Sequence, residues 1–269
     1  MDNLLAALMG VVEGLTEFLP ISSTGHLIIA GHFSGFDNMM PKDAADAFKV
    51  VIQLGAILAV VAAYPGRFTG LLRFSDNRGL TGLRGIGLLA ITSIPASIVA
   101  LFVRESIHEH LFNNTTVSIA LIVGALWILA VERFRPRARV DSVDAITWKE
   151  ALAIGLFQCL SLWPGMSRSA STILGGMIVG VERKAATEYS FFAAVPIMVA
   201  ATLYEFYKSY TLFEAVQLQI LAIGFIVSFV SAWAAVKSFI HFLGRHTLVP
   251  FGWYRLLVGG VVLWMALRS

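Results

Sequence analysis

Two glutamates lie one helical turn apart near the start of the chain, within an otherwise apolar run. Glu13 and Glu17 have the i, i+4 spacing that places both carboxylates on one face of a helix. Two carboxylates so close repel each other unless a cation or a shared proton lies between them. Magnesium is commonly held by one or two carboxylates together with phosphate oxygens. The pair therefore predicts a site for a divalent metal cation, Mg²⁺ or Ca²⁺.

A serine-rich turn follows these glutamates. Within it, Ser23 is a candidate nucleophile, and His26 is a candidate base for a serine or acid for a leaving phosphate. Ser22 and Thr24 provide further hydroxyl groups for binding a substrate. Hydroxyls in membrane helices more often serve packing than catalysis, so this interpretation depends on the acids nearby.

A second polar cluster lies in the carboxyl-terminal half, around Arg168. Hydroxyl groups surround this arginine, at Ser167, Ser169, Ser171 and Thr172. The start of a helix offers free N–H groups and the positive end of a dipole, and a guanidinium binds phosphate through two hydrogen bonds. We therefore expect Arg168 to hold a phosphate, with Ser167, Ser169 and Thr172 as substrate-binding residues.

The composition places these polar clusters in a membrane. The 269 residues are 57% hydrophobic and 14% charged, with a mean hydropathy of +0.77, whereas soluble domains are about 25% charged. An ionisable side chain at membrane depth costs about 2.5 to 3.5 kcal/mol on insertion scales, so those that are kept there usually have a function. The alternative is that Glu13 and Glu17 have no catalytic function and that their side chains extend to the membrane–water interface.

Three other polar residues need a separate interpretation. Gln53 is a supporting candidate for binding substrate, although neighbouring helices could equally satisfy its amide. Arg255 lies near the end of the last apolar stretch, where a snorkelling anchor is expected. Cys159 is a lone cysteine in apolar surroundings and is expected to be an inert packing residue.

Six apolar stretches are long enough to cross a membrane as helices. They are Val50–Tyr64, Gly85–Val103, Thr115–Val131, Ala185–Tyr204, Ala215–Val236 and Val249–Leu267. The chain is therefore predicted to be an all-α polytopic membrane protein, with residues 1–269 forming one integral membrane domain. Its formal charge of +3 comes from basic loops beside these stretches, which are topology signals rather than a nucleic-acid site. The loops at 67–84 and 133–149 are expected in the cytoplasm, with both termini outside.

Four shorter segments carry the polar clusters. They are Leu4–Phe18, Thr24–Phe33, Ala151–Trp163 and Ser171–Val181, and prolines interrupt each pair. Each pair is predicted to form a re-entrant hairpin. One hairpin followed by three spans occurs in residues 1 to about 135 and again in about 148–269, which predicts an inverted repeat with both hairpins facing one cavity. Alignment on Pro20 and Pro164 pairs Ser23 with Ser167.

The two clusters resemble the signature motifs of the bacterial undecaprenyl-pyrophosphate phosphatases, also called bacitracin-resistance proteins. The first motif runs Glu13-Gly-Leu-Thr-Glu17-Phe-Leu-Pro-Ile-Ser-Ser-Thr-Gly-His26, and the second runs Pro164-Gly-Met-Ser-Arg-Ser-Ala-Ser-Thr172. The segment Phe48–Ile57, which contains Gln53, and the chain length also match. One departure is Ala170, where the family often has glycine.

This resemblance implies hydrolysis of undecaprenyl pyrophosphate to undecaprenyl phosphate and inorganic phosphate, which recycles the carrier lipid for cell-wall synthesis. It implies a divalent cation at Glu13 and Glu17, catalysis by Glu17, Ser23 and His26, and phosphate binding by Arg168. The expected setting is the bacterial cytoplasmic membrane, with the active site facing the periplasm or exterior. The expected partners are a prenyl pyrophosphate and membrane lipids, bacitracin would compete by binding the substrate, and a homodimer stays open.

Two other function classes remain open from the sequence. Inverted repeats with broken helices are also typical of transporters, so the chain could flip a lipid phosphate instead of cleaving it. The histidine-nucleophile membrane phosphatases share part of the motif in outline. They usually have a second histidine after the arginine, whereas here no histidine follows Arg168 before His241.

Overall fold

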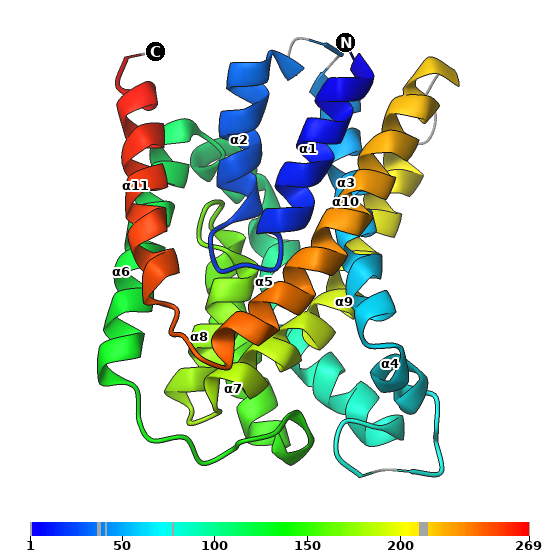
Figure 1. Ribbon diagram of the computed structural model, residues 1–269, viewed down its shortest axis with the longest axis vertical. Coiled ribbons are helices and arrows are strands. Elements are labelled where there is room, and N and C mark those ends of the chain that lie inside the picture. The colour runs from blue at the N-terminus through cyan, green and yellow to red at the C-terminus, as the bar shows by residue number, and fades with distance from the viewer. Residues whose placement is uncertain (1, 37–38, 41, 77, 210–214, 269) are drawn as a thin grey trace.

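The computed structural model describes residues 2–36, 39–40, 42–76, 78–209 and 215–268, and these residues form helices joined by turns. In chain order the long helices are α3 (Lys42–Ala63), α5 (Gly82–Leu111), α6 (Asn114–Phe134), α9 (Arg183–Ser209), α10 (Ala215–Leu243) and α11 (Val249–Ala266). The described residues at the two ends of the chain lie at the same end of the molecule (Figure 1). The predicted all-α fold is confirmed.

Five helical stretches are long and apolar enough to cross a membrane. They are Gly82–Val103, Asn114–Phe134, Arg183–Tyr204, Leu218–Leu243 and Val249–Ala266. A sixth is formed if Ala47–Ala63 and α4 (Pro65–Leu71) count as one span, which bends by 88°. Pro65 explains the break, because proline lacks an N–H and is suited to the first turn of a new helix. Counted in this way, the structure agrees with the six predicted spans.

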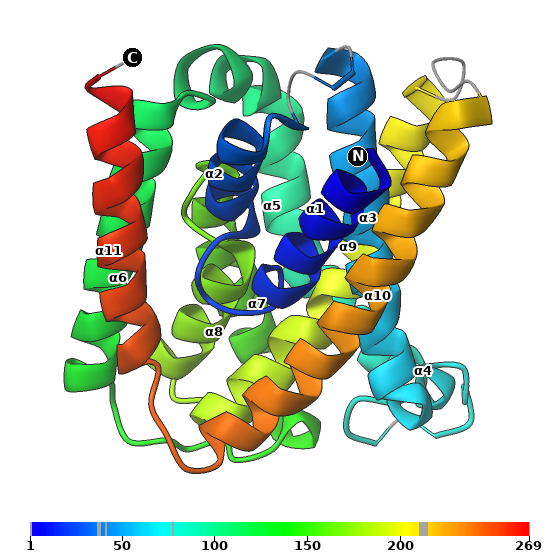
Figure 2. The ribbon, with the colours of Figure 1, turned by 45° about the horizontal axis from the view of Figure 1, so that its top comes forward.

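Four short helices match the predicted half-length segments. They are α1 (Asp2–Thr16), α2 (Ser23–Ser34), α7 (Trp148–Gln158) and α8 (Arg168–Ile178), and the 3₁₀ helix η3 (Cys159–Leu162) follows α7. At 11 to 15 residues they are shorter than the roughly 20 residues of a full span. The α1–α2 pair and the α7–α8 pair enter the bundle from opposite ends, and each turns back near the middle (Figures 1 and 2).

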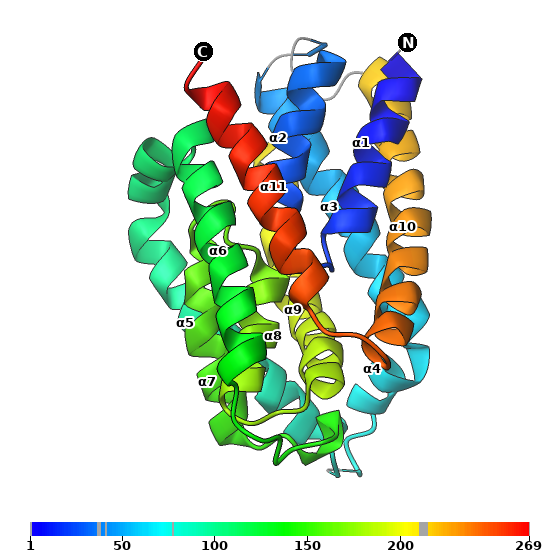
Figure 3. The ribbon, with the colours of Figure 1, turned by 60° about the vertical axis from the view of Figure 1, so that its left-hand side comes forward.

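Close helix packing holds the α1–α2 pair in place. A side chain at Gly14 would collide with the Ser231 hydroxyl and the Ser228 carbonyl of α10, so α1 and α10 approach almost backbone to backbone. Small residues commonly permit such an approach in membrane helices, where packing replaces the hydrophobic effect. On the other side, α11 lies along α6 and close to α2 (Figure 3).

The end of the molecule opposite the termini is held by charged loop residues. Arg67 of α4 donates two hydrogen bonds to the carboxylate of Asp144, at 2.8 and 2.9 Å. Asp144 lies in the 3₁₀ helix η2 (Val143–Ala145) and also accepts a bond from the Leu80 N–H. Partial burial raises the pKa of Asp144, but the Leu80 N–H and the Arg67 guanidinium outweigh it and hold that pKa below its usual value. These contacts tie α4 to the connection between α6 and α7.

Candidate active site

The turn between α1 and α2 and the turn between α7 and α8 have the same backbone conformation where the second helix begins. Ser22 caps α2 and Ser167 caps α8, with φ angles of 71° and 74°. Among the described residues these two are the non-glycine residues with positive φ. Each side chain accepts a hydrogen bond from the N–H three residues on, at Gly25 and Ala170. Such backbone strain costs about 1 to 3 kcal/mol and clusters at functional sites.

The caps correct the alignment of the two motifs. They pair Ser22 with Ser167, whereas the expected pairing was Ser23 with Ser167. The first motif has one residue fewer than the second between its proline and its cap. An alignment anchored on the prolines therefore pairs the wrong serines. Ser23 and Arg168 consequently occupy the same place, the first residue of their half-helices.

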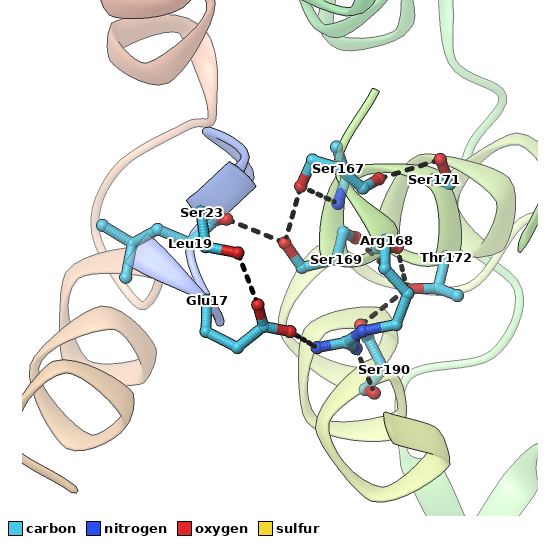
Figure 4. Close-up of polar contacts among 10 residues, drawn as sticks. Glu17, Leu19, Ser23, Ser167, Arg168, Ser169, Ser171, Thr172 and Ser190 are labelled. Carbon is cyan, nitrogen blue, oxygen red and sulfur yellow. Dashed lines mark hydrogen bonds and ion pairs between the residues drawn. The ribbon is translucent and has the colours of Figure 1, made fainter. Parts of the chain in front are cut away.

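Glu17 joins the two helix starts. The Ser23 hydroxyl donates to Glu17 Oε2 at 2.6 Å, and Arg168 Nη2 donates to Glu17 Oε1 at 3.1 Å (Figure 4). Glu17 is 7% exposed and Ser23 is 9% exposed, so water competes little for these bonds. One carboxylate therefore orients both the candidate nucleophile and the candidate phosphate ligand.

Arg168 is held from a second side by α9. Its Nη1 donates to the Ser190 carbonyl at 3.1 Å, and the Phe18 ring lies 5.7 Å from its guanidinium carbon. Thr172 and Ser190 hydroxyls are 2.6 Å apart (Figure 4). Sequence reasoning missed Ser190, because this residue lies outside both motifs.

A cavity of about 240 Å³ lies between the two helix starts. Of the predicted site residues, its wall contains Glu17, Ser22, Ser23, Thr24, Gln53, Ser167 and Arg168. Ser161 of η3 also lines it and was not predicted. Residues from three distant parts of the sequence thus meet around a space of a size suited to a small polar group.

His26 is turned away from this cavity. Its Nδ1 lies 2.8 Å from the Ser22 carbonyl, and its Nε2 lies 2.7 Å from the Tyr254 hydroxyl of α11. A carbonyl only accepts, so Nδ1 carries the hydrogen, and Nε2 of the neutral ring accepts from tyrosine. The two rings also stack, with centroids 5.4 Å apart. Both ring nitrogens therefore have partners other than Ser23.

Ser169 and Thr172 also lie outside the cavity wall. The Ser169 hydroxyl donates to the Leu19 carbonyl at 2.8 Å, which links the second motif to the first. Thr172 donates to the Arg168 carbonyl at 3.0 Å and so braces the first turn of α8. In this arrangement both hydroxyls support the two turns, and their predicted role in substrate binding stays a prediction.

Glu13 is the most isolated of the predicted residues. It is 1% exposed, and neither carboxylate oxygen has a hydrogen-bond partner. Within the described part of the chain, no group of three or more His, Cys, Asp or Glu side chains could form a metal cage. Two carboxylates do fit a hard cation that takes its remaining ligands from phosphate and water. The orphaned oxygens of Glu13 are thus compatible with the predicted cation site.

The expectation that Arg255 is a snorkelling anchor is wrong. Its side chain is fully buried and donates five hydrogen bonds to backbone carbonyls. The acceptors are Pro20 in the first turn, Gly165 and Met166 in the second, and Ala120 and Leu121 in α6. A side chain at Gly124 would collide with the guanidinium, so glycine there makes room for it. Arg255 holds both turns to one point.

The chain is similar to known proteins over nearly its whole length, both motifs included. A family model described as Bacitracin resistance protein BacA matches residues 6–261. The undecaprenyl-diphosphatase of Maridesulfovibrio salexigens is 56% identical over 258 residues, which cover 96% of each chain. That of Oleidesulfovibrio alaskensis is 56% identical over 263 residues, covering 97% of this chain and 98% of its own. Undecaprenyl-diphosphatase 2 of Rhodospirillum rubrum is 47% identical over 269 residues, covering 98% and 96%. The resemblance seen in the two motifs is confirmed, and the chain belongs to the bacitracin-resistance protein BacA family.

Proposed function

We propose that this protein hydrolyses undecaprenyl pyrophosphate to undecaprenyl phosphate and inorganic phosphate. The observation that carries the proposal is the Ser23–Glu17–Arg168 arrangement, in which one buried carboxylate binds a hydroxyl and a guanidinium at two facing helix starts. A helix start, hydroxyl groups and an arginine together favour a phosphate. The names of the relatives supply the same activity independently.

The geometry favours Glu17 as the base for Ser23. Glu17 Oε2 takes the hydroxyl proton as Ser23 Oγ attacks the terminal phosphorus, and the bond from that phosphorus to the bridging oxygen breaks. Glu17 passes the proton to the departing lipid phosphate. It then takes a proton from a water that attacks the phosphoserine, and returns that proton to Ser23 as inorganic phosphate leaves. Arg168 and the N–H groups at the two helix starts hold the phosphate oxygens throughout.

This assignment moves proton transfer from His26 to Glu17. Ser23 already donates to Glu17, while both ring nitrogens of His26 are engaged elsewhere. His26 then serves to fix the start of α2 against α11. Direct attack by a water activated at Glu17 is the remaining route, and trapping of a phosphoserine at Ser23 distinguishes the two.

Glu13 and Glu17 are the residues that would hold a divalent cation, Mg²⁺ or Ca²⁺. When bound, the cation would neutralise charge that develops on the transferred phosphate. The unpartnered carboxylate of Glu13 supports this proposal, because an isolated buried charge is costly unless it is paired or protonated.

We also propose the finer architecture and setting that the motifs predict. Six spans, with α3 and α4 counted as one, and two re-entrant hairpins form an inverted repeat of about 1–135 and 148–269 in the bacterial cytoplasmic membrane. The matching caps at Ser22 and Ser167 support the repeat. Basic loops at 67–84 and 133–149 support an active site that faces the exterior, where bacitracin would sequester the lipid pyrophosphate. A homodimer is compatible with this arrangement.

A lipid-phosphate transporter is the second candidate. Two broken helices that meet near the middle of a bundle are the plan of such proteins. A transporter has no need for a carboxylate that takes a hydrogen bond from a serine beside an arginine, so hydrolysis is the better supported function.

The deciding experiment is release of inorganic phosphate from undecaprenyl pyrophosphate by the purified protein in detergent, with and without a chelator. We expect metal-dependent release that is lost in Glu17→Ala and Arg168→Ala. Asp144→Asn, which lies outside the cavity, is the folded control. No release by the well-folded unsubstituted protein with metal present would refute hydrolysis, and movement of lipid phosphate between leaflets would then be measured.

A further inference from the structure

A long apolar groove lies beside the polar cavity. It encloses about 730 Å³ and is bounded by α5, α9 and η3. Its wall along α5 extends from Ile86 to Ala100, which is about 21 Å at 1.5 Å of helix rise per residue. Its wall along α9 extends from Val195 to Ala201. The groove is therefore larger than the polar cavity and different in chemistry.

The groove and the polar cavity are continuous. Ser161, Arg168, Ile197 and Ala201 line both spaces. Arg168 thus contacts Glu17 on the side of the cavity and also forms part of the groove wall. A molecule with a polar head at the helix starts would have its remaining length directed past these four residues into the groove.

Unsatisfied polar atoms mark this junction. Arg168 Nε and Gln158 Oε1 are buried and have no hydrogen-bond partner, and both residues line the groove. Gln158 is 1% exposed, and its amide nitrogen is already used on the Thr92 carbonyl at 3.2 Å. Buried polar atoms are rarely left without a partner, so the junction has capacity for a polar group that the protein itself does not provide.

The groove also opens sideways between α5 and α9. Ala90 and Ser97 on one helix and Pro196 and Ala200 on the other are exposed, although all four line the groove. Small residues in membrane helices usually bring two helices into close contact. Here they border open space instead, which leaves room for a chain to enter from the lipid.

We propose that this groove binds the prenyl chain of the lipid pyrophosphate while the pyrophosphate lies at Ser23 and Arg168. The proposal rests on the proposed hydrolysis and assigns a position to the part of the substrate that does not react. The isoprene units nearest the head pass Ser161, Ile197 and Ala201, and the following units lie along α5. The distal part of a long chain leaves through the opening into the bilayer. The groove thereby makes catalysis sensitive to chain length.

Filling the groove tests the proposal. Ala200→Phe and Ala90→Phe place a ring in the groove, and neither residue lines the polar cavity. Ala130→Phe on α6 is the matched control, because it adds the same ring at an exposed alanine away from the groove. Each variant is assayed with undecaprenyl pyrophosphate and with farnesyl pyrophosphate, which share a head group and differ in chain length.

We expect Ala200→Phe and Ala90→Phe to lower kcat/KM about tenfold for the long substrate, the effect of losing contact with roughly two buried methylene groups. For the short substrate the loss should be smaller in Ala90→Phe, whereas Ala200→Phe lies beside the first isoprene units and should affect both substrates; Ala130→Phe should change neither. Equal losses for both substrates in Ala90→Phe, or no loss in either groove variant, would overturn the assignment of the prenyl chain to the groove. If the unsubstituted protein cleaves neither substrate, the proposed hydrolysis itself fails.

Photo-crosslinking tests occupancy without turnover. A prenyl pyrophosphate with a diazirine in its chain is bound to Ser23→Ala and irradiated, and the labelled peptides are identified by mass spectrometry. Labels within 86–100 and 195–201 that excess unlabelled prenyl pyrophosphate removes would support the proposal. Labels spread over lipid-facing helices at random would refute it.

Discussion

The α1–α2 turn and the α7–α8 turn have the same frame and different chemistry. Each ends in a serine cap with positive φ, at Ser22 and Ser167. The next residue is Ser23 in one turn and Arg168 in the other, so a hydroxyl and a guanidinium occupy equivalent places. The two turns thus place a nucleophile and a cation on opposite sides of one small cavity.

The likeness extends to the residues that support the turns. His26 donates to the Ser22 carbonyl, and Ser171, at the equivalent place, donates to the Ser167 carbonyl at 2.9 Å. Arg255 binds the carbonyl two residues before each cap, at Pro20 and Gly165. The two turns therefore share the hydrogen bonds that hold the first helical residue in place. They differ in the chemistry of that residue.

Glu17 has no counterpart in the second turn, and its removal should have the largest effect. Glu17→Gln keeps the size of the side chain but cannot take a proton from Ser23. We expect kcat to fall by about 10²- to 10⁴-fold, the usual contribution of a general base. Phosphate release under saturating lipid measures it, and Glu13→Gln under excess metal separates proton transfer from cation binding. A Glu17→Gln protein with near-normal kcat would remove Glu17 from catalysis.

Arg255 is the residue that the two turns share, and its replacement should have the next largest effect. Arg255→Met leaves buried carbonyls of both turns without donors, and each buried acceptor left unsatisfied costs about 1 to 3 kcal/mol. Arg255→Lys restores charge without the planar fork, so we expect partial recovery of thermal stability and a kcat still about 10²-fold low.

The separate effects on kcat and KM distinguish a positioning role of Arg255 from a purely structural one. If Arg255 sets the distance between Ser23 and Arg168, Arg255→Lys lowers kcat with KM little changed, in protein that remains folded. Loss of folded protein with normal kcat in the surviving fraction would limit Arg255 to stability.

Much of this design could be predicted from sequence, and the exceptions have a physical cause. Pro20, Pro164 and the polar residues around them predicted two broken segments and most of the cavity wall, because polar groups at membrane depth are rare. Arg255 and Ser190 could not be assigned in this way. The partners of these two residues are carbonyls and side chains distant in sequence. In addition, the sequence alone does not distinguish a buried arginine from one that snorkels to the interface.

The direction of the His26 ring is a further feature that the sequence does not reveal. The position of His26 three residues after Ser23 predicts a base, but a helix starting at Ser23 carries residue 26 back over its cap. The sequence reveals the spacing, whereas the ring direction follows from Tyr254, which lies 228 residues away.

The equivalence of His26 and Ser171 yields the third prediction. Tyr254→Phe removes the hydroxyl partner of Nε2 and keeps the ring stacking, so we expect kcat to fall by no more than about fivefold, the value of one neutral hydrogen bond of about 1 kcal/mol. His26→Asn, which can still donate to the Ser22 carbonyl, should retain more activity than His26→Phe. A loss of about 10³-fold in both His26 variants with stability unchanged would return His26 to the role of base.

Asp144 provides the smallest expected effect, because it lies far from both turns in the chain and binds only the loop region. Its pKa is lowered in the folded protein, so its contribution to stability is present above the unfolded pKa and is lost as pH falls through the folded value. Asp144 is 43% exposed in its pair with Arg67, so solvent screens the pair to about 0.2 to 1 kcal/mol. We expect Asp144→Asn to lower the unfolding temperature slightly at neutral pH, and not at acid pH, with kcat unchanged. A drop in kcat comparable to that of Arg255→Lys would mean that contacts at the loop end also set the distance between Ser23 and Arg168.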